Sequence, residues 1–387
     1  MNAIVVPAAR PVSHDYVGQV AAVAKETRTR LLILASHDAG SGAMADLLDN
    51  MAVPEWWVVK VPDKGLAPPF MTFQSPDMIP DHARRLPPSN LSDKRNLGSL
   101  VGRVMGWERL TFSDDDVRFE AAALRALSLV LPGRKIAGML CTTEFGLGHT
   151  RSGFPDKDVI HQARDALVRI HFPARVRACH EYEDVAHISG NSIATNPQTS
   201  GLVFPPKIYD EDLIAFHGIG IYREEDAAAL SLDSRYYQAT YDPFADPDRA
   251  KYEAFGEMVH DALFLPIHDE RPADITDRKY WDGIITQRIE KIETLIGVLN
   301  APQDRGKFNY MTTPPKRNPA QEEKIRRSLQ VALDMNRTFT GSMGVEYMRA
   351  WADDREVWQS KVAALTRKKS LPGALDWLGV SYVTNVA

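Results

Sequence analysis

Cysteine, excess positive charge and long apolar segments are all scarce in this sequence of 387 residues. Its two cysteines, Cys141 and Cys179, can form at most one disulfide and lack the CxxC spacing of zinc or redox sites. A reduced, cytoplasmic location is therefore expected. The formal net charge of −5 excludes the global basic field that holds nucleic acid, so no nucleic-acid partner is expected.

No stretch approaches the roughly 20 apolar residues that span a bilayer, so no transmembrane segment is expected. The apolar run at residues 3–9 is too short for a signal peptide and has no basic leader before it. Internal repeats and low-complexity tracts are also lacking. A hydrophobic share of 44% and a charged share of 25% are instead typical of a globular protein with a substantial core.

Short apolar runs alternate with amphipathic segments from residue 30 to residue 140. Unbroken apolar runs of this length are typical of buried parallel strands, and apolar residues at helical spacing are typical of helices packed on a sheet. The pattern predicts an α/β fold with a mostly parallel sheet. Expected strands are 30–36, 56–61, 110–112 and 136–140, and expected helices are 43–51, 92–105 and 119–131.

Beyond residue 275 the pattern becomes helical. Apolar residues recur on one broad face, with charged residues opposite, which is typical of amphipathic helices. The expected helices are 280–299, 321–335 and 345–365. The sequence thus predicts a helical region after the α/β part.

Three consecutive carboxylates, Asp114, Asp115 and Asp116, follow the expected strand 110–112. Ligands of parallel sheets bind at the carboxyl ends of the strands. Mutual repulsion within the triplet is offset naturally by Mg²⁺ or Mn²⁺, which prefer carboxylate oxygens. The triplet therefore predicts a site for a metal and a diphosphate. The alternative is that these residues favour the positive end of a helix dipole.

The segment around this triplet resembles the core of GT-A glycosyltransferases. It contains the run SDKRNLG at 92–98, a helix ended by Gly106, a strand, and then FSDDDV at 112–117. In that superfamily an Arg-Asn-x-Gly helix precedes the strand that carries a DxD-type motif. The resemblance implies a Rossmann-like, nucleotide-sugar-binding GT-A domain over residues 1–270, followed by a helical C-terminal region at 271–387.

The resemblance also implies roles for single residues. Asp116 is expected to bind the metal, Mn²⁺ or Mg²⁺, directly, and Asp114 to lie near the ribose or the metal. Arg95, a fixed multi-donor cation, is expected to face the nucleotide or its diphosphate. The expected donor-binding residues are Ser36, Asp38, Arg95, Asp114 and Asp115. Ser36 and Asp38 lie in the turn 35–38, which we expect to follow the first strand.

A second acidic group, Glu211-Asp212, resembles the Glu-Asp pair that supplies the general base in inverting members of the superfamily. We expect Asp212 to take the proton of the acceptor hydroxyl and Glu211 to support it. The alternative is again an acidic helix start. His217 is expected as a further metal ligand because it is the nearest histidine after this segment, whereas His260 and His268 are more remote.

These features predict a metal-dependent glycosyltransferase that moves a sugar from a UDP- or GDP-sugar to the hydroxyl of an unnamed acceptor. One alternative is a nucleotidyltransferase of sugar phosphates, although its usual basic residue is missing from the glycine-containing loop 37–42. Another is a non-catalytic nucleotide- or sugar-binding protein on the same fold. A homo-oligomer is compatible with the sequence, but the sequence does not determine the oligomeric state. It also does not determine whether the anomeric configuration of the sugar is retained or inverted.

Overall fold

The computed structural model describes most of the chain. The described residues are 1–13, 15–62, 72–84, 90–139, 142–143, 192–220, 227–230, 236–238, 244–268, 274–300 and 319–386. Cys141, Cys179 and residues 301–318, between the expected helices 280–299 and 321–335, lie outside these residues. Within them, no helix is both long enough and apolar enough to cross a membrane.

An eight-stranded sheet with the order β11-β3-β2-β1-β4-β8-β6-β9 forms the centre of the molecule. Pairing is parallel from β3 through β2 and β1 to β4 and between β6 and β9, whereas β8 and β11 pair antiparallel with their neighbours. The predicted α/β fold with a mostly parallel sheet is therefore confirmed. The strands are β1 (Ala3–Ala8), β2 (Arg30–Ala35), β3 (Trp56–Lys60), β4 (Leu110–Phe112), β6 (Ile136–Met139), β8 (Ile193–Thr195), β9 (Ala227–Leu230) and β11 (Ser381–Thr384).

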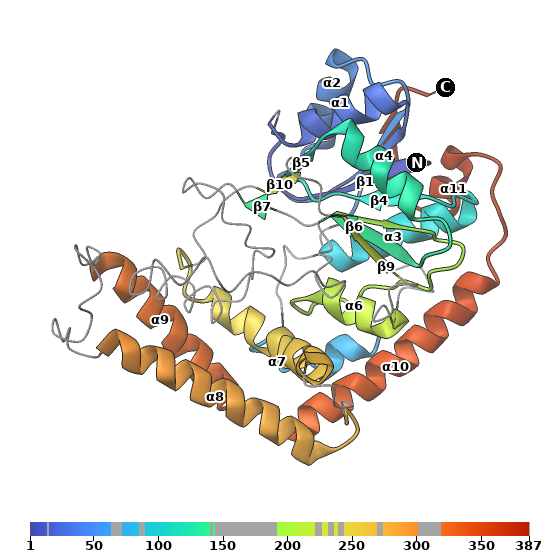
Figure 1. Ribbon diagram of the computed structural model, residues 1–387. Coiled ribbons are helices and arrows are strands. Elements are labelled where there is room, and N and C mark those ends of the chain that lie inside the picture. Colours follow the sequence, from blue (N-terminus) through green and yellow to red (C-terminus); the bar gives the residue numbers. More distant parts are fainter. Residues whose placement is uncertain are drawn as a thin grey trace.

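Helices cover both faces of this sheet (Figure 1). Alternate residues of β1 show why: Ala3 and Val5 belong to one apolar core, and Ile4 and Val6 belong to the other. The second core contains residues of α1 (Val17–Thr27), α2 (Ser41–Asn50) and α4 (Ala121–Val130). The first contains residues of α3 (Leu91–Val104) and α6 (Glu211–Ile219). Strand alternation thus builds a three-layer arrangement.

The prediction that residues 30–36 form the first strand is wrong, because β1 precedes them. β1 is buried throughout and lies between β2 and β4. Pro7 argues against a central strand in the sequence. The structure accommodates it because the β4 pairing stops opposite Val5, so that Pro7 lies where β1 pairs with β2. Ser36 and Asp38 consequently follow the second strand.

A smaller sheet has the strand order β5-β10-β7, and its first strand, β5, directly follows the acidic triplet in the sequence. Its strands are β5 (Val117–Phe119), β7 (Thr142–Thr143) and β10 (Tyr236–Gln238), and β10 pairs antiparallel with β5 and parallel with β7. β5 occupies the beginning of the expected helix 119–131, which starts only at Ala121. The acidic triplet is thus held between strands of two sheets.

The expected C-terminal helices are present, and the apolar core continues into them. They are α8 (Arg278–Asn300), α9 (Pro319–Asn336) and α10 (Gly341–Ala363), and two helices that were not expected, α7 (Arg249–His268) and α11 (Leu371–Trp377), lie before and after them. Phe255 of α7, Trp281 of α8 and Trp351 of α10 belong to the same core as Val5 of the sheet. The chain then returns to the sheet, where β11 adds to its edge beside β3. A boundary at residue 270 stays a prediction.

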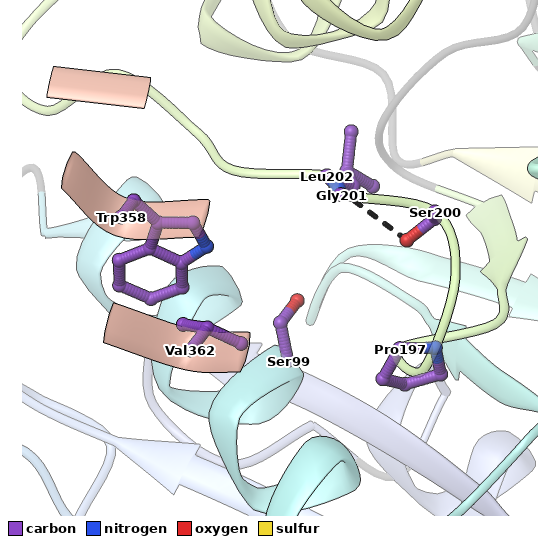
Figure 2. Close-up of a pocket in the computed structure, with 7 residues that line it drawn as sticks. All are labelled: Ser99, Pro197, Ser200, Gly201, Leu202, Trp358 and Val362. Atoms are coloured by element: carbon purple, nitrogen blue, oxygen red, sulfur yellow. Dashed lines mark hydrogen bonds between the residues drawn. The ribbon is translucent and has the colours of Figure 1, made fainter. Parts of the chain in front are cut away.

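A cavity of about 20 Å³ lies between α3, α10 and the segment 197–202 (Figure 2). Its lining is formed by Ser99, Pro197, Ser200, Gly201, Leu202, Trp358 and Val362. This volume holds about one water molecule, so the cavity is too small for a sugar or a nucleotide.

Packing of α10 against α8 predicts opposite effects for two glycine-to-alanine substitutions. A Cβ at Gly344 would lie 2.2 Å from the buried ring of Trp281, whereas a Cβ at Gly283 of α8 would meet nothing within 4 Å. Gly344→Ala is expected to lower the free energy of unfolding by about 1–3 kcal/mol through overpacking. Gly283→Ala is expected to raise it by about 0.5–1 kcal/mol through helix propensity. Urea unfolding measures both, and equal effects would contradict the described contact.

Candidate functional site

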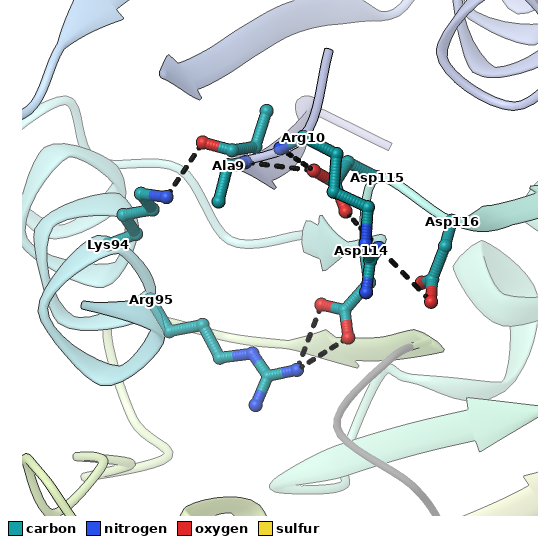
Figure 3. Close-up of polar contacts among 8 residues, drawn as sticks. Ala9, Arg10, Lys94, Arg95, Asp114, Asp115 and Asp116 are labelled. Carbon is teal, nitrogen blue, oxygen red and sulfur yellow. Dashed lines mark hydrogen bonds and ion pairs between the residues drawn. The ribbon is translucent and has the colours of Figure 1, made fainter. Parts of the chain in front are cut away.

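The acidic triplet lies at the carboxyl end of β4, beside the carboxyl end of β1 (Figure 3). The backbone N–H of Ser113 donates to the carbonyl of Val5, which extends the contact between the two strands up to Asp114. β4 is fully buried, so its end is fixed by the sheet. The triplet therefore occupies the kind of sheet edge at which α/β proteins bind ligands.

Asp115 is hydrogen-bonded to the backbone directly after β1. Its Oδ2 accepts the backbone N–H groups of Ala9 and Arg10 at 2.8 Å and 2.9 Å, and its Oδ1 accepts from the Arg10 guanidinium. Asp115 is 9% exposed. In the structure, both oxygens of this expected donor-binding residue contact the chain itself.

Arg10 is a site residue that the sequence analysis missed. Its Nη1 contacts Asp115 and lies 3.1 Å from Oδ2 of Asp116. Burial disfavours the charged guanidinium, but the three aspartates outweigh burial and raise the pKa of Arg10 above its ordinary value. In the sequence, Arg10 is a basic residue directly after the apolar run 3–9. Its position indicates a site residue only when that run is recognised as the first strand.

Arg95 joins the triplet to the second acidic group. Its Nη2 lies 2.9 Å from Oδ1 of Asp114, and its Nη1 lies 2.7 Å from Oε1 of Glu211. The side chains of Arg95 and Glu211 are 2% and 5% exposed. Burial disfavours the guanidinium, yet the carboxylates of Asp114, Glu211 and Asp212 raise its pKa above the ordinary value. The structure thus brings together residues 116 positions apart in sequence.

The residues beside Arg95 explain why the Lys-Arg-Asn-x-Gly run suits this position. Lys94 Nζ donates to the carbonyl of Ala8 at 2.7 Å, and Asn96 exchanges two hydrogen bonds of 2.8 Å with the backbone of Phe204. A Cβ at Gly98 would lie 2.9 Å from both Phe112 and Val5. The glycine lets α3 lie close on β1 and β4, and the polar residues bind the chain on either side.

Glu211 and Asp212 begin α6 and have different environments. Glu211 is 4% exposed and is paired with Arg95. Asp212 is partly exposed, and its Oδ1 accepts the N–H of Leu213 at 3.0 Å. Asp210, the residue before the helix, has a left-handed φ of 58°. Of the pair, Asp212 is the carboxylate that solvent or a substrate can reach.

Three other predicted site residues lie apart from the Arg95 contacts. Ser36 is 5% exposed and donates to Oδ1 of Asn90 at 3.1 Å, and the N–H of Asp38 donates to the carbonyl of Ala9 at 3.2 Å. His217 lies in the last turn of α6, where burial and Arg355 lower its pKa to about 4. The positive charge of Arg355 also disfavours a metal ion at this histidine. The role of His217 as a metal ligand stays a prediction.

The chemistry of the triplet fits a divalent cation. Carboxylate oxygens from Asp114 and Asp116 are ligands that Mg²⁺ and Mn²⁺ accept, usually together with phosphate oxygens and water. Arg10 is the cation beside Asp115 and Asp116 in the structure, and its side chain is 58% exposed. An exposed arginine can move away, so its presence is compatible with metal binding.

Removal of the Arg95 charge should destabilise the protein strongly. We expect Arg95→Met to lower the free energy of unfolding by about 3–5 kcal/mol, because it leaves Asp114 and Glu211 without this buried partner. Arg125→Met is the matched control, since its pair with Glu26 is 59% exposed on both sides and should contribute less than about 1 kcal/mol. Chemical denaturation of both variants checks this, and a small effect at Arg95 would contradict it.

The lowered pKa of His217 predicts a loss of stability in acid. Its folded-state pKa of about 4 lies below the ordinary 6.5, so the unfolded state binds the proton more readily as the pH falls through this interval. Wild type should lose about 1–2 kcal/mol more than His217→Gln between pH 7.5 and pH 5. Urea midpoints at both pH values measure this difference. Substitution of the exposed His82 by glutamine should leave the wild-type pH dependence, and identical profiles for His217→Gln and wild type would refute the prediction.

Comparison with models of protein families and with curated proteins finds no match. Among solved structures, TarS 1–349 of S. aureus aligns at a TM-score of 0.40 with 11% identity, covering 94% of this chain and 91% of that one. Glucosyl-3-phosphoglycerate synthase from Mycobacterium tuberculosis, in complex with Mn²⁺, uridine diphosphate and phosphoglyceric acid, aligns at 0.38 with 13% identity, covering 71% and 81%. The same enzyme in complex with Mg²⁺ and uridine diphosphate aligns at a TM-score of 0.38 with 12% identity, and the alignment covers 71% of this chain and 82% of that one.

Proposed function

We propose that the chain is a metal-dependent glycosyltransferase that moves a sugar from a nucleotide-sugar to an acceptor hydroxyl. The observation that carries the proposal is the buried guanidinium of Arg95, which contacts Asp114 of the triplet and Glu211 of the second acidic group. The two acidic groups therefore belong to one site at the carboxyl ends of β1 and β4. The proposal also rests on the GT-A-like Arg-Asn-x-Gly and Asp-Asp-Asp segments.

In this proposal the triplet serves the donor. Asp114 and Asp116 would hold Mn²⁺ or Mg²⁺, which stabilises negative charge on a departing diphosphate. Arg10 lies against the same carboxylates and is exposed enough to turn toward phosphate oxygens. Ser36 and Asp38 lie beside the end of β1, and in this proposal they would contact the nucleoside. A UDP- or GDP-sugar is the proposed donor.

Asp212 serves the acceptor. As the acceptor oxygen bonds to the anomeric carbon, the bond from that carbon to the diphosphate oxygen breaks, and the hydroxyl proton passes to Asp212. Glu211 is 4% exposed and its carboxylate accepts from Arg95, so an acceptor can reach it less easily than Asp212. Its ion pair instead holds the first turn of α6, and Asp212 with it.

A nucleotidyltransferase is the second candidate, and the position of β1 bears on it. The segment after the first strand is 9–16, which contains the basic residue Arg10 that loop 37–42 lacks. It contains no glycine, however, whereas a phosphate-cradling loop needs backbone that can approach the ligand closely. Release of pyrophosphate from a nucleoside triphosphate and a sugar 1-phosphate would identify this activity.

The donor site can be tested by thermal unfolding with UDP, GDP, CDP or dTDP, each with and without Mn²⁺. We expect one nucleotide to raise the Tm only when Mn²⁺ is present, since ligand at 100 times its Kd stabilises by about 2.7 kcal/mol. Asp116→Asn should lose this shift. Asp81→Asn, at a carboxylate that is 93% exposed, is the matched control and should keep it.

Asp212→Asn separates binding from catalysis in the same experiment. It should keep the nucleotide-dependent shift and lose about 10²–10⁴-fold in transfer or donor hydrolysis, since it removes the base and leaves the donor site intact. Absence of a shift with every nucleotide in the wild type would refute the transferase proposal and favour a protein without a nucleotide donor.

A further inference from the structure

We propose that Asp210, Glu257 and His260 form a second divalent metal site, distinct from the aspartate triplet. Nδ1 of His260 lies 3.9 Å from Oδ2 of Asp210 and 3.9 Å from Oε2 of Glu257. One ligand atom from each of the three residues lies within 4.8 Å of the other two. This site goes beyond the proposed transferase activity and does not depend on it.

The spacing of these atoms suits ligands of one ion. A separation of 3.9 Å is too long for a hydrogen bond between imidazole and carboxylate. Metal bonds of about 2.0–2.2 Å from histidine nitrogen and carboxylate oxygen place neighbouring ligand atoms about 3–3.6 Å apart. To surround a cation, the two pairs at 3.9 Å would shorten by a few tenths of an ångström, and the third pair, which lies within 4.8 Å, would shorten by up to about 1–2 Å.

Two elements supply the ligands. Glu257 and His260 are three residues apart on α7 and lie on the same face of this helix, the Glu-x-x-His spacing used in metal-binding helical bundles. Asp210 comes from the turn before α6. A Cβ at Gly256 would lie 2.2 Å from the carbonyl oxygen of Tyr209, so the glycine lets this turn lie directly on α7. The fold thus delivers the third ligand to the helical pair.

The surroundings hold the ligand residues in place. Asp261 adds a third carboxylate, 4.0 Å from Nδ1 of His260, and Arg288 contacts Asp261 and lies 3.9 Å from Glu257. Arg288 also donates to the carbonyl of Glu257 and to Asn336, both at 3.2 Å. The side chains of Glu257 and Arg288 are both 3% exposed, so their positions are fixed by packing. Such outer contacts are typical of groups that orient metal ligands.

The donor set indicates the class of metal. Two carboxylate oxygens with one imidazole nitrogen suit Mn²⁺ or Zn²⁺ better than Mg²⁺ or Ca²⁺, which take oxygen ligands almost exclusively. A metal at this position would hold Asp210, the residue directly before Glu211 and Asp212. We therefore assign the site a positioning role, in which the ion fixes the start of α6 against α7.

Binding of Mn²⁺ alone, without any nucleotide, tests the site. Electron paramagnetic resonance counts bound Mn²⁺, and spin-echo modulation from nitrogen reports a histidine ligand. Asp116→Asn, which removes a ligand of the triplet, should retain a bound Mn²⁺ with nitrogen modulation. His260→Gln should lose the nitrogen modulation and weaken this binding at least 10-fold. His82→Gln, at an exposed histidine, is the matched control and should retain the modulation.

The outcomes separate this site from the donor site. Loss of all Mn²⁺ binding in Asp116→Asn, or nitrogen modulation that survives in His260→Gln, would overturn the second site without touching the transferase proposal. His260 is 22% exposed, so its substitution is compatible with folding, and the Tm without metal checks this. Should His260→Gln fail to fold, Asp210→Asn provides the same readout. Wild type that binds no Mn²⁺ or Zn²⁺ without nucleotide would also reject the site.

Discussion

The buried guanidinium of Arg95 between Asp114 and Glu211 is the interaction on which the arrangement of the site depends. Burying these charges is expensive, and only close pairing with hydrogen bonds offsets the loss of hydration. Arginine suits this position because its planar fork donates to two carboxylates at once. The requirement fixes three elements together: α3, the end of β4 and the start of α6. The geometry of the candidate site and the fold therefore share one constraint.

Small residues make this constraint possible. Gly98 allows α3 to approach β1 and β4, which sets the distance from Arg95 to Asp114. Gly256 allows the turn at Tyr209–Asp210 to approach α7, which sets the direction in which Glu211 enters α6. In both places a methyl group would push a helix off its neighbour. The same close approach that brings Glu211 to Arg95 also brings Asp210 to Glu257 and His260, so the two acidic environments are consequences of one turn.

Much of the α/β fold was predictable because its signals are local. β2, β3, β4 and β6 are short apolar runs, and α8, α9 and α10 carry a clear helical period. β1 was missed because Pro7 conflicts with a central strand unless the pairing on one side is known to stop. Arg10 was missed with it. The pairing of Arg95 with Glu211 and the approach of His260 to Asp210 were beyond prediction, since they depend on the packing of α3, α6 and α7.

Arg95 and Arg10 differ in the free energy that would be needed to separate each guanidinium from its carboxylates. We therefore infer different roles for them. Arg95 is 2% exposed and holds two carboxylates, so its removal from them would leave buried charges. Arg10 is 58% exposed and can turn into solvent, whereas the side chains of Asp115 and Asp116 beside it are 8% and 10% exposed and need a cation near them. In the proposed function, a divalent ion with a diphosphate would replace Arg10 as the positive charge beside Asp116, and the released guanidinium would then be available to the phosphate oxygens. Arg95 is thus the permanent counter-ion of the site, and Arg10 the exchangeable one.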